Sequence, residues 1–110
     1  MKYDIFTTER AAADLRGIYE YIAYDLMSEQ NALGQLERLE RAVMSLDEMP
    51  ERCPVYAREP WTSRGLRVMP VDNYLVFYLT DKAKLTVTIV RVMYGRRDIP
   101  AELEKDAGTE

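Results

Sequence analysis

Three apolar, strand-like runs separated by short polar turns place the strongest constraint on how this chain folds. They are Leu66–Val71, Tyr74–Leu79 and Leu85–Met93, and the turns between them are Asp72-Asn73 and Thr80–Lys84. Short runs rich in Val, Ile, Leu and Tyr between turn residues are typical of antiparallel strands joined as hairpins. We therefore predict three antiparallel strands in the second half of the chain.

Two amphipathic helices are predicted before these strands. Their apolar residues recur every three or four positions, as Ala11, Leu15, Ile18, Ile22 and Leu26 and then as Ala32, Leu36, Leu39, Val43 and Leu46. Thr7 or Thr8 is suited to cap the first helix and Ser28 the second. Because only about three residues connect the helices, we expect an antiparallel helical hairpin.

The remaining segments supply one more strand and a long loop. Lys2–Phe6 reads as a short first strand. Met49–Ser63 contains three prolines, which exclude regular structure over most of its length. We expect Tyr56 and Trp61 to anchor this loop on the body of the protein.

The predicted fold class is α+β with the order β-α-α-β-β-β, an antiparallel sheet packed on the N-terminal helical hairpin. At 110 residues the chain is long enough for one core. We predict a single domain over residues 1–100, followed over residues 101–110 by an acidic C-terminal tail, which is either a ragged end or a short final helix.

The composition excludes several kinds of chemistry. The chain has no histidine, so a His general base, a Ser-His or Cys-His couple and a His-ligated metal site are excluded. Its single cysteine, Cys53, can form no internal disulfide and has no metal-ligand companion. We expect no metal and no cofactor. No apolar run is long enough to span a membrane and no secretory signal is visible, so we expect a cytoplasmic protein.

The net charge of −4 hides an asymmetry along the chain. Residues 1–50 hold 10 acids and 5 bases, whereas residues 51–100 hold 9 bases and 5 acids. The last ten residues hold 4 acids and 1 base. The cationic second half could bind an anionic partner, or it could be a solvated surface of mixed charge.

Four arginines lie within the otherwise apolar strand region, namely Arg67, Arg91, Arg96 and Arg97. A small sheet whose apolar strands carry cations often presents them to an anion. Arg91 could instead lie at an edge and reach solvent or Asp98, and the Arg96-Arg97-Asp98 segment could be a solvated turn. Both interpretations remain open from the sequence.

The order of the elements, together with five short segments, resembles the RelE/ParE superfamily of bacterial type II toxins. The segments are ADLRGIYEYIA, LDEMPERCP, GLR, NYLVFY and IVRVMYGRRDI, and they extend over nearly the whole chain. The resemblance implies a growth-inhibiting toxin that is neutralised by a cognate antitoxin. An acidic antitoxin segment would be attracted to the cationic second half.

The superfamily contains two mechanisms. RelE-like members cut messenger RNA on the ribosome by attack of a 2′-hydroxyl on the adjacent phosphate, which requires proton transfer and stabilisation of a phosphorane. The lysines that RelE uses have no counterpart between Pro54 and Asp81, and Leu75 stands where RelE carries an arginine. The catalytic residues of such an enzyme would here be Arg67, Arg91 and Tyr94.

ParE-like members bind DNA gyrase and need no catalytic base. Three segments of the chain are slightly closer to this branch, namely GLR, NYLVFY and IVRVMYGRRD. Met93 and Tyr94, however, replace the usual Leu-His pair of the branch. In this case the target or the antitoxin would contact four arginines, Arg67, Arg91, Arg96 and Arg97. A third hypothesis is an inactive module that still binds an antitoxin.

Overall fold

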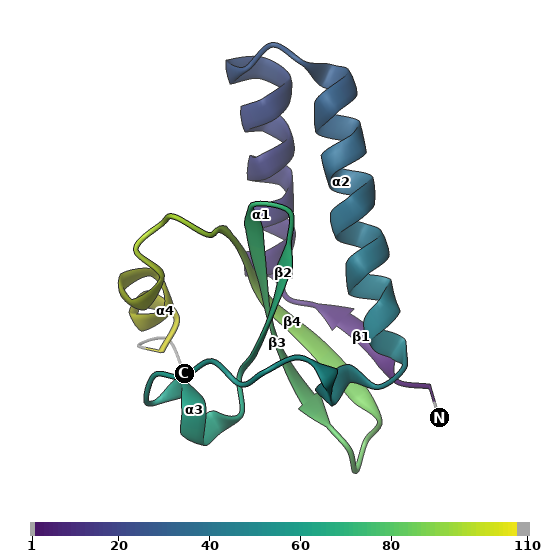
Figure 1. Cartoon of the computed structure of the whole chain (residues 1–110), viewed down its shortest axis with the longest axis vertical. Coiled ribbons are helices and arrows are strands. Elements are labelled where there is room, and N and C mark those ends of the chain that lie inside the picture. Colours follow the sequence, from purple (N-terminus) through teal and green to yellow (C-terminus); the bar gives the residue numbers. More distant parts are fainter. Residues whose placement is uncertain (1, 108–110) are drawn as a thin grey trace.

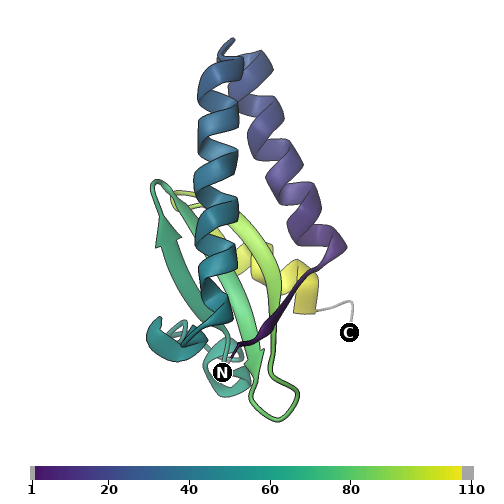
Figure 2. The ribbon, with the colours of Figure 1, turned by 90° about the vertical axis from the view of Figure 1, so that its right-hand side faces the viewer.

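A helical hairpin stands against one face of a four-stranded sheet, and a C-terminal helix covers the other face (Figures 1 and 2). This computed structural model describes residues 2–107. The elements are β1 (Asp4–Thr7), α1 (Glu9–Glu20), the π-helical turn η1 (Tyr21–Asp25), α2 (Glu29–Met44), the 3₁₀ turns η2 (Ser45–Asp47) and η3 (Pro50–Arg52), α3 (Trp61–Arg64), β2 (Arg67–Val71), β3 (Tyr74–Asp81), β4 (Thr86–Tyr94) and α4 (Ile99–Ala107). The predicted α+β fold with an N-terminal helical hairpin is confirmed.

The hairpin helices begin where their capping residues predict. The Thr8 hydroxyl accepts a hydrogen bond from the Ala11 N–H at 3.0 Å, and the Ser28 hydroxyl accepts one from Asn31 at 3.4 Å. Each bond satisfies a backbone donor that has no partner within the helix. The first helix does not stop at Glu20 but widens into η1, so that it runs on to Asp25.

The sheet has the strand order β1-β4-β3-β2. The predicted antiparallel pairing of β2 with β3 and of β3 with β4 is confirmed. The first strand differs from the prediction, because β1 pairs with β4 in parallel and makes the sheet mixed. The helical hairpin lies between β1 and the other strands in the chain, and such a long connection can return the chain in either direction.

A β-bulge in β4 changes which residues share a face. Strict alternation would place Arg91 with Val87 and Ile89, but the register shifts between Phe77 and Tyr78 of the facing strand. Val87 and Ile89 therefore face the hairpin, whereas Arg91 pairs with Phe77, whose side chain faces α4.

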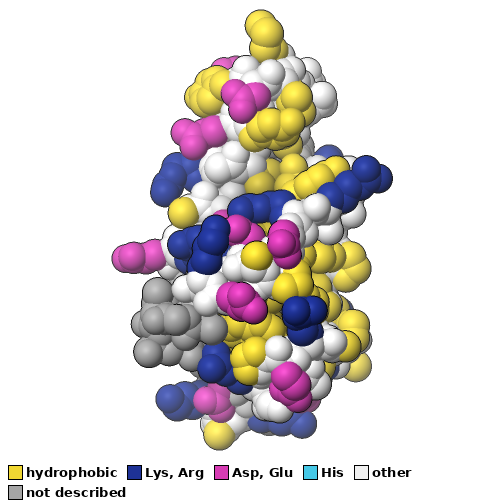
Figure 3. All heavy atoms as spheres, turned by 90° about the vertical axis from the view of Figure 1, so that its left-hand side faces the viewer, with side chains coloured by type: hydrophobic (Ala, Val, Ile, Leu, Met, Phe, Trp, Pro, Cys, Tyr) yellow, Lys and Arg dark blue, Asp and Glu magenta, His cyan; other side chains and the backbone are white. Residues whose placement is uncertain are grey.

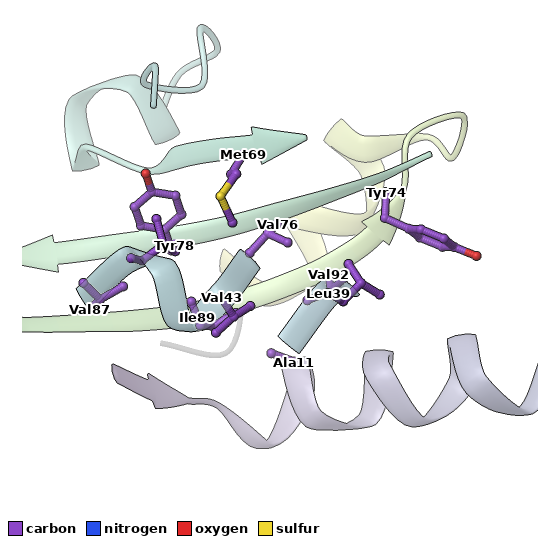
Figure 4. Packing of buried hydrophobic residues seen from close by; sticks show 11 residues of the cluster. Ala11, Leu39, Val43, Met69, Tyr74, Val76, Tyr78, Val87, Ile89 and Val92 are labelled. Carbon is purple, nitrogen blue, oxygen red and sulfur yellow. The ribbon is translucent and has the colours of Figure 1, made fainter. Parts of the chain in front are cut away.

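Two apolar clusters hold the layers together. The first joins the hairpin to the sheet through residues such as Leu39, Val43, Val76 and Ile89 (Figure 4). The second lies on the opposite face and contains Trp61, Leu66, Phe77, Met93, Ile99 and Leu103. The sheet is therefore buried on both faces.

The loop before β2 is anchored as expected. Trp61 is buried in the second cluster, and the ring of Tyr56 packs edge-on against Phe77 with 5.5 Å between centroids. The expected tail begins within α4, whose Leu103 is fully buried, so a short final helix is what the structure contains. Residues 108–110 of the predicted tail lie outside the described residues. Within residues 2–107, no helix is long and apolar enough to cross a membrane.

Candidate functional site

A cleft of about 1050 Å³ separates the helical hairpin from one end of the sheet. The hairpin supplies one wall, and the other consists of the turn between β2 and β3 together with the end of β4. Its lining includes Asp14, Ile18, Tyr21, Leu26, Gln35, Asn73, Tyr74, Val92, Tyr94 and Arg97. Apolar and aromatic walls with a few polar groups are typical of a binding site.

Three tyrosines give the cleft its aromatic character. Tyr74 is buried, and its ring packs edge-on against that of Tyr94 with 5.9 Å between centroids. Burial raises the pKa of Tyr74, and the neighbouring phenols of Tyr94 and Tyr21 raise it further. Tyr74 is therefore neutral at physiological pH and is unsuited to act as a base, while Tyr94 is 40% exposed and can contact a partner.

Arg91 lies behind this cleft and is only 1% exposed. Its guanidinium donates two hydrogen bonds to the carboxylate of Asp14, from Nε at 2.7 Å and from Nη2 at 3.0 Å. Such a bidentate arrangement is the strongest form of this ion pair. Arg91 is thus not at a sheet edge that reaches solvent, and the carboxylates near it include Asp14 and, at 3.6 Å, Glu102.

Asp14 also completes the edge of β4. The parallel partner β1 ends opposite Ile89, so β4 has no strand beside Val92 on that side. The Asp14 carboxylate accepts a hydrogen bond from this N–H at 2.9 Å. One side chain of α1 therefore satisfies the backbone of β4 and the charge of Arg91 together.

Glu102 of α4 connects the arginines to the C-terminal helix. Its carboxylate lies 2.6 Å from Arg97, 2.9 Å from Lys105 and 3.6 Å from Arg91. The hydrogen bond from Lys105 holds the pKa of Glu102 below its usual value, and the charges of Arg97 and Arg91 act in the same direction. The Arg96-Arg97-Asp98 segment is therefore tied to α4 through Arg97.

The low pKa of Glu102 predicts a loss of stability in acid. Because the carboxylate is favoured in the folded state, its contribution is complete above the ordinary value of 4.5 and is lost as the pH falls through the lower folded-state value. Urea unfolding between pH 6 and pH 3 should therefore show a smaller loss of stability in Glu102→Gln than in the wild type. Equal pH dependence in the two proteins would contradict this role for Glu102.

Arg67 lies at a different place on the sheet. Its guanidinium donates to the carbonyl of Cys53 at 2.6 Å and of Glu51 at 3.2 Å. It thereby holds the loop before β2, as does the Tyr78 hydroxyl, which donates to the Pro50 carbonyl at 2.6 Å. Arg67 pairs with Tyr78 in the middle of β3, four residues along the strand from Tyr74, which lines the cleft.

The structure thus brings together only part of the predicted site. Tyr94 and Arg97 line the cleft, Arg91 lies buried behind it, and Arg96 is exposed in the turn after β4. The functional roles predicted for these residues and for Arg67 remain predictions.

Sequence reasoning missed Asp14 and Glu102. The signal for Asp14 was its position three residues after Ala11 and four before Ile18, on the apolar stripe of the first helix. The sequence contains no comparable signal for Glu102. Within the described part of the chain, no group of three or more acidic, Cys or His side chains is placed to hold a metal ion.

Comparison with known proteins places this architecture among toxins. The sequence model of the family described as "ParE toxin of type II toxin-antitoxin system, parDE" matches residues 5–99. No curated protein matches the sequence.

Solved structures share the fold at low sequence identity. A structure of the chromosomal ParDE system of P. aeruginosa has a TM-score of 0.69 at 20% identity, covering 84% of this chain and 96% of the other. The RelBE2 toxin-antitoxin complex of Mycobacterium tuberculosis gives 0.64 at 22% identity, over 86% and 99% of the two chains. A mutant of the E. coli toxin RelE gives 0.62 at 15% identity, over 93% of each.

Proposed function

The chain belongs to the ParE toxin family of type II toxin-antitoxin systems, and from this membership we propose that it arrests growth by binding DNA gyrase. In this proposal the protein is not an enzyme. A cognate antitoxin neutralises it until the antitoxin is lost. Since gyrase acts on chromosomal DNA, the site of action is the bacterial cytoplasm.

The observation that carries the proposal is the burial of Arg91. A nuclease would need its phosphate-binding cation at the surface, but Arg91 is 1% exposed and is held by Asp14. Arg67 pairs with Tyr78 and Tyr94 pairs with Tyr74, so the two positions are four residues apart along β3. At ~3.3 Å per residue their backbones are roughly 13 Å apart along the strand, and the Arg67 guanidinium is already bonded to the Cys53 and Glu51 carbonyls.

Antitoxin binding accounts for the exposed cations. Arg96 and Arg97 follow β4 in an exposed turn, and Tyr94 lies directly before them. An acidic antitoxin segment could pair with both arginines and pack on the tyrosine. We therefore assign Arg96 and Arg97 to antitoxin contact and give Arg91 a structural role.

One observation favours a second candidate, the ribosome-dependent endoribonuclease. Tyr94 and Arg97 line the same cleft, and together they could contact a phosphate and a 2′-hydroxyl. In this alternative Tyr94 takes part in proton transfer and Arg97 stabilises the phosphorane.

One pair of assays separates the two candidates. Purified toxin should inhibit gyrase supercoiling or accumulate cleaved DNA, and it should leave messenger RNA intact on programmed ribosomes. New RNA ends at the A site that disappear in Tyr94→Phe would instead support the nuclease. A folded toxin that acts in neither assay and arrests no growth would support the inactive module.

The assignment to antitoxin contact has its own test. The double variant Arg96→Ala/Arg97→Ala should bind the antitoxin at least tenfold more weakly, whereas Lys82→Ala/Lys84→Ala, an equal loss of charge in the turn between β3 and β4, should bind normally. Equal binding by the two variants would contradict the assignment.

A further inference from the structure

The far end of the helical hairpin extends beyond the sheet and exposes an unusual amount of apolar surface. We call residues 20–33 the hairpin tip; they comprise the end of α1, the turn η1 and the start of α2. Five of the nine large hydrophobic side chains exposed in the described part of the chain lie here, and they are Tyr21, Tyr24, Leu26, Met27 and Leu33. A concentration of this kind typically marks a protein-binding surface.

The hairpin tip is also acidic. Residues 20–33 contain three acids, Glu20, Asp25 and Glu29, and no Lys or Arg. All three acidic residues are exposed. In the space-filling view, the upper end of the molecule shows hydrophobic and acidic side chains, and the Lys and Arg side chains begin lower down (Figure 3).

Met27 is not explained by the stability of the hairpin. It is 87% exposed and has φ = 53°, a left-handed conformation that favours glycine or asparagine. The N–H of Ser28 bonds to the carbonyl of Ile22 around it, a closure one residue wider than the usual one at a left-handed helix end. A large apolar side chain therefore occupies a strained position while contributing little to the core.

The charge of Asp25 runs against local stability as well. It is the last residue of η1, where the helix dipole favours a cation, and the last turn contains no base. Met27 and Asp25 are thus unfavourable or neutral for the isolated protein, whereas Glu29 is favourable in the first turn of α2. Residues that break local rules without a structural return are commonly functional.

We propose that the hairpin tip binds the cellular target through a surface of that target that carries Lys and Arg around an apolar patch. The proposal rests on the toxin function proposed above and adds a place on the molecule where the target binds. Tyr24, Leu26 and Met27 supply the apolar contacts, and Glu20, Asp25 and Glu29 pair with the cations around them.

The negative charge of the hairpin tip distinguishes it from the proposed antitoxin contact, which is positively charged. An acidic antitoxin segment is attracted to Arg96 and Arg97 but is repelled by three carboxylates at the tip. The toxin therefore offers surfaces of opposite charge to its two partners. The antitoxin could then block the target by covering the adjoining cleft, without a strong attachment to the tip itself.

Two tip variants and one matched control test the proposal. Asp25→Lys/Glu29→Lys reverses the charge of the tip, and Met27→Asn removes the apolar contact while suiting the left-handed backbone. Glu37→Lys/Glu104→Lys is the control, because it changes the net charge equally at exposed sites on α2 and α4. Readouts are growth arrest in E. coli, binding to purified gyrase A and B subunits at two salt concentrations, and binding to the antitoxin encoded beside the toxin.

We expect each tip variant to bind gyrase at least tenfold more weakly and to lose growth arrest, while the control retains both. Antitoxin binding should persist in all variants, and Met27→Asn should melt no lower than the wild type. Added salt should weaken wild-type binding to gyrase but have little effect on the residual binding of the charge-reversed variant.

Other outcomes overturn one proposal or the other. Tip variants that remain as toxic as the control would refute the role of the tip and leave the gyrase proposal standing. Growth arrest that depends on the tip without binding to gyrase would refute gyrase as the target and retain the tip. Loss of antitoxin binding or of self-association, with toxicity intact, would make the tip an antitoxin or dimer surface and would refute the inference. A wild type that arrests no growth and binds no gyrase would refute both proposals.

Discussion

Replacing Asp14 by alanine is expected to lower the free energy of unfolding by about 3 kcal/mol. The change removes the two short hydrogen bonds that Arg91, whose side chain is 2% exposed, donates to Asp14, and it removes the acceptor of the Val92 N–H. Glu102 remains 3.6 Å from Arg91 but is shared with Arg97 and Lys105, so it compensates only in part. Urea unfolding monitored by circular dichroism measures the loss.

A control variant and a double variant show whether the ion pair is the cause. Asp25→Ala removes an exposed acid from the same hairpin and should change stability by less than about 0.5 kcal/mol. In Asp14→Leu/Arg91→Met the buried charges are removed together, and we expect a stability closer to that of the wild type than to Asp14→Ala. A loss below about 1 kcal/mol in Asp14→Ala would show that the pair contributes little to the fold.

The second large effect is expected at Leu103. This residue is fully buried in the second cluster, although it lies in the segment that the sequence presents as an acidic tail. Leu103→Ala should cost about 3 kcal/mol, from lost burial and from the cavity that remains. The matched variant Glu104→Ala, at an exposed neighbouring position, should be nearly neutral. If thermal melting showed no difference between the two, residues 101–107 would be dispensable for the fold.

The sequence predicts the elements of this fold better than their connections. The apolar stripes of the two hairpin helices and the caps at Thr8 and Ser28 are local signals in the sequence. The helices of the structure begin at these caps. The parallel pairing of β1 with β4 depends on how the hairpin packs, so no nearby residue encodes it. The bulge opposite Phe77 likewise leaves no mark on an apolar strand.

The candidate site is predicted less well for a related reason. Counting arginines in the sequence identifies the cations, but their burial and their ion-pair partners decide which of them can bind another molecule. Arg91 and Arg97 look equivalent in the sequence, yet one is held by a carboxylate from α1, 77 residues away, and the other reaches the surface. The aromatic wall of the cleft is equally hard to predict from the sequence. Tyr21 and Tyr74 come to line the same cleft only after the hairpin has packed on the sheet.

The pairing of β1 with β4 also has a consequence for synthesis. Asp4 lies opposite Thr86, and the Thr8 hydroxyl bonds to the Val90 carbonyl across a separation of 82 residues. Contacts this distant in sequence form slowly, since a long loop must close before they stabilise anything. The sheet therefore cannot be completed until β4, the last of its strands, has been synthesised. Until then β1 has no strand to pair with, and its unsatisfied edge is open to contact with other chains.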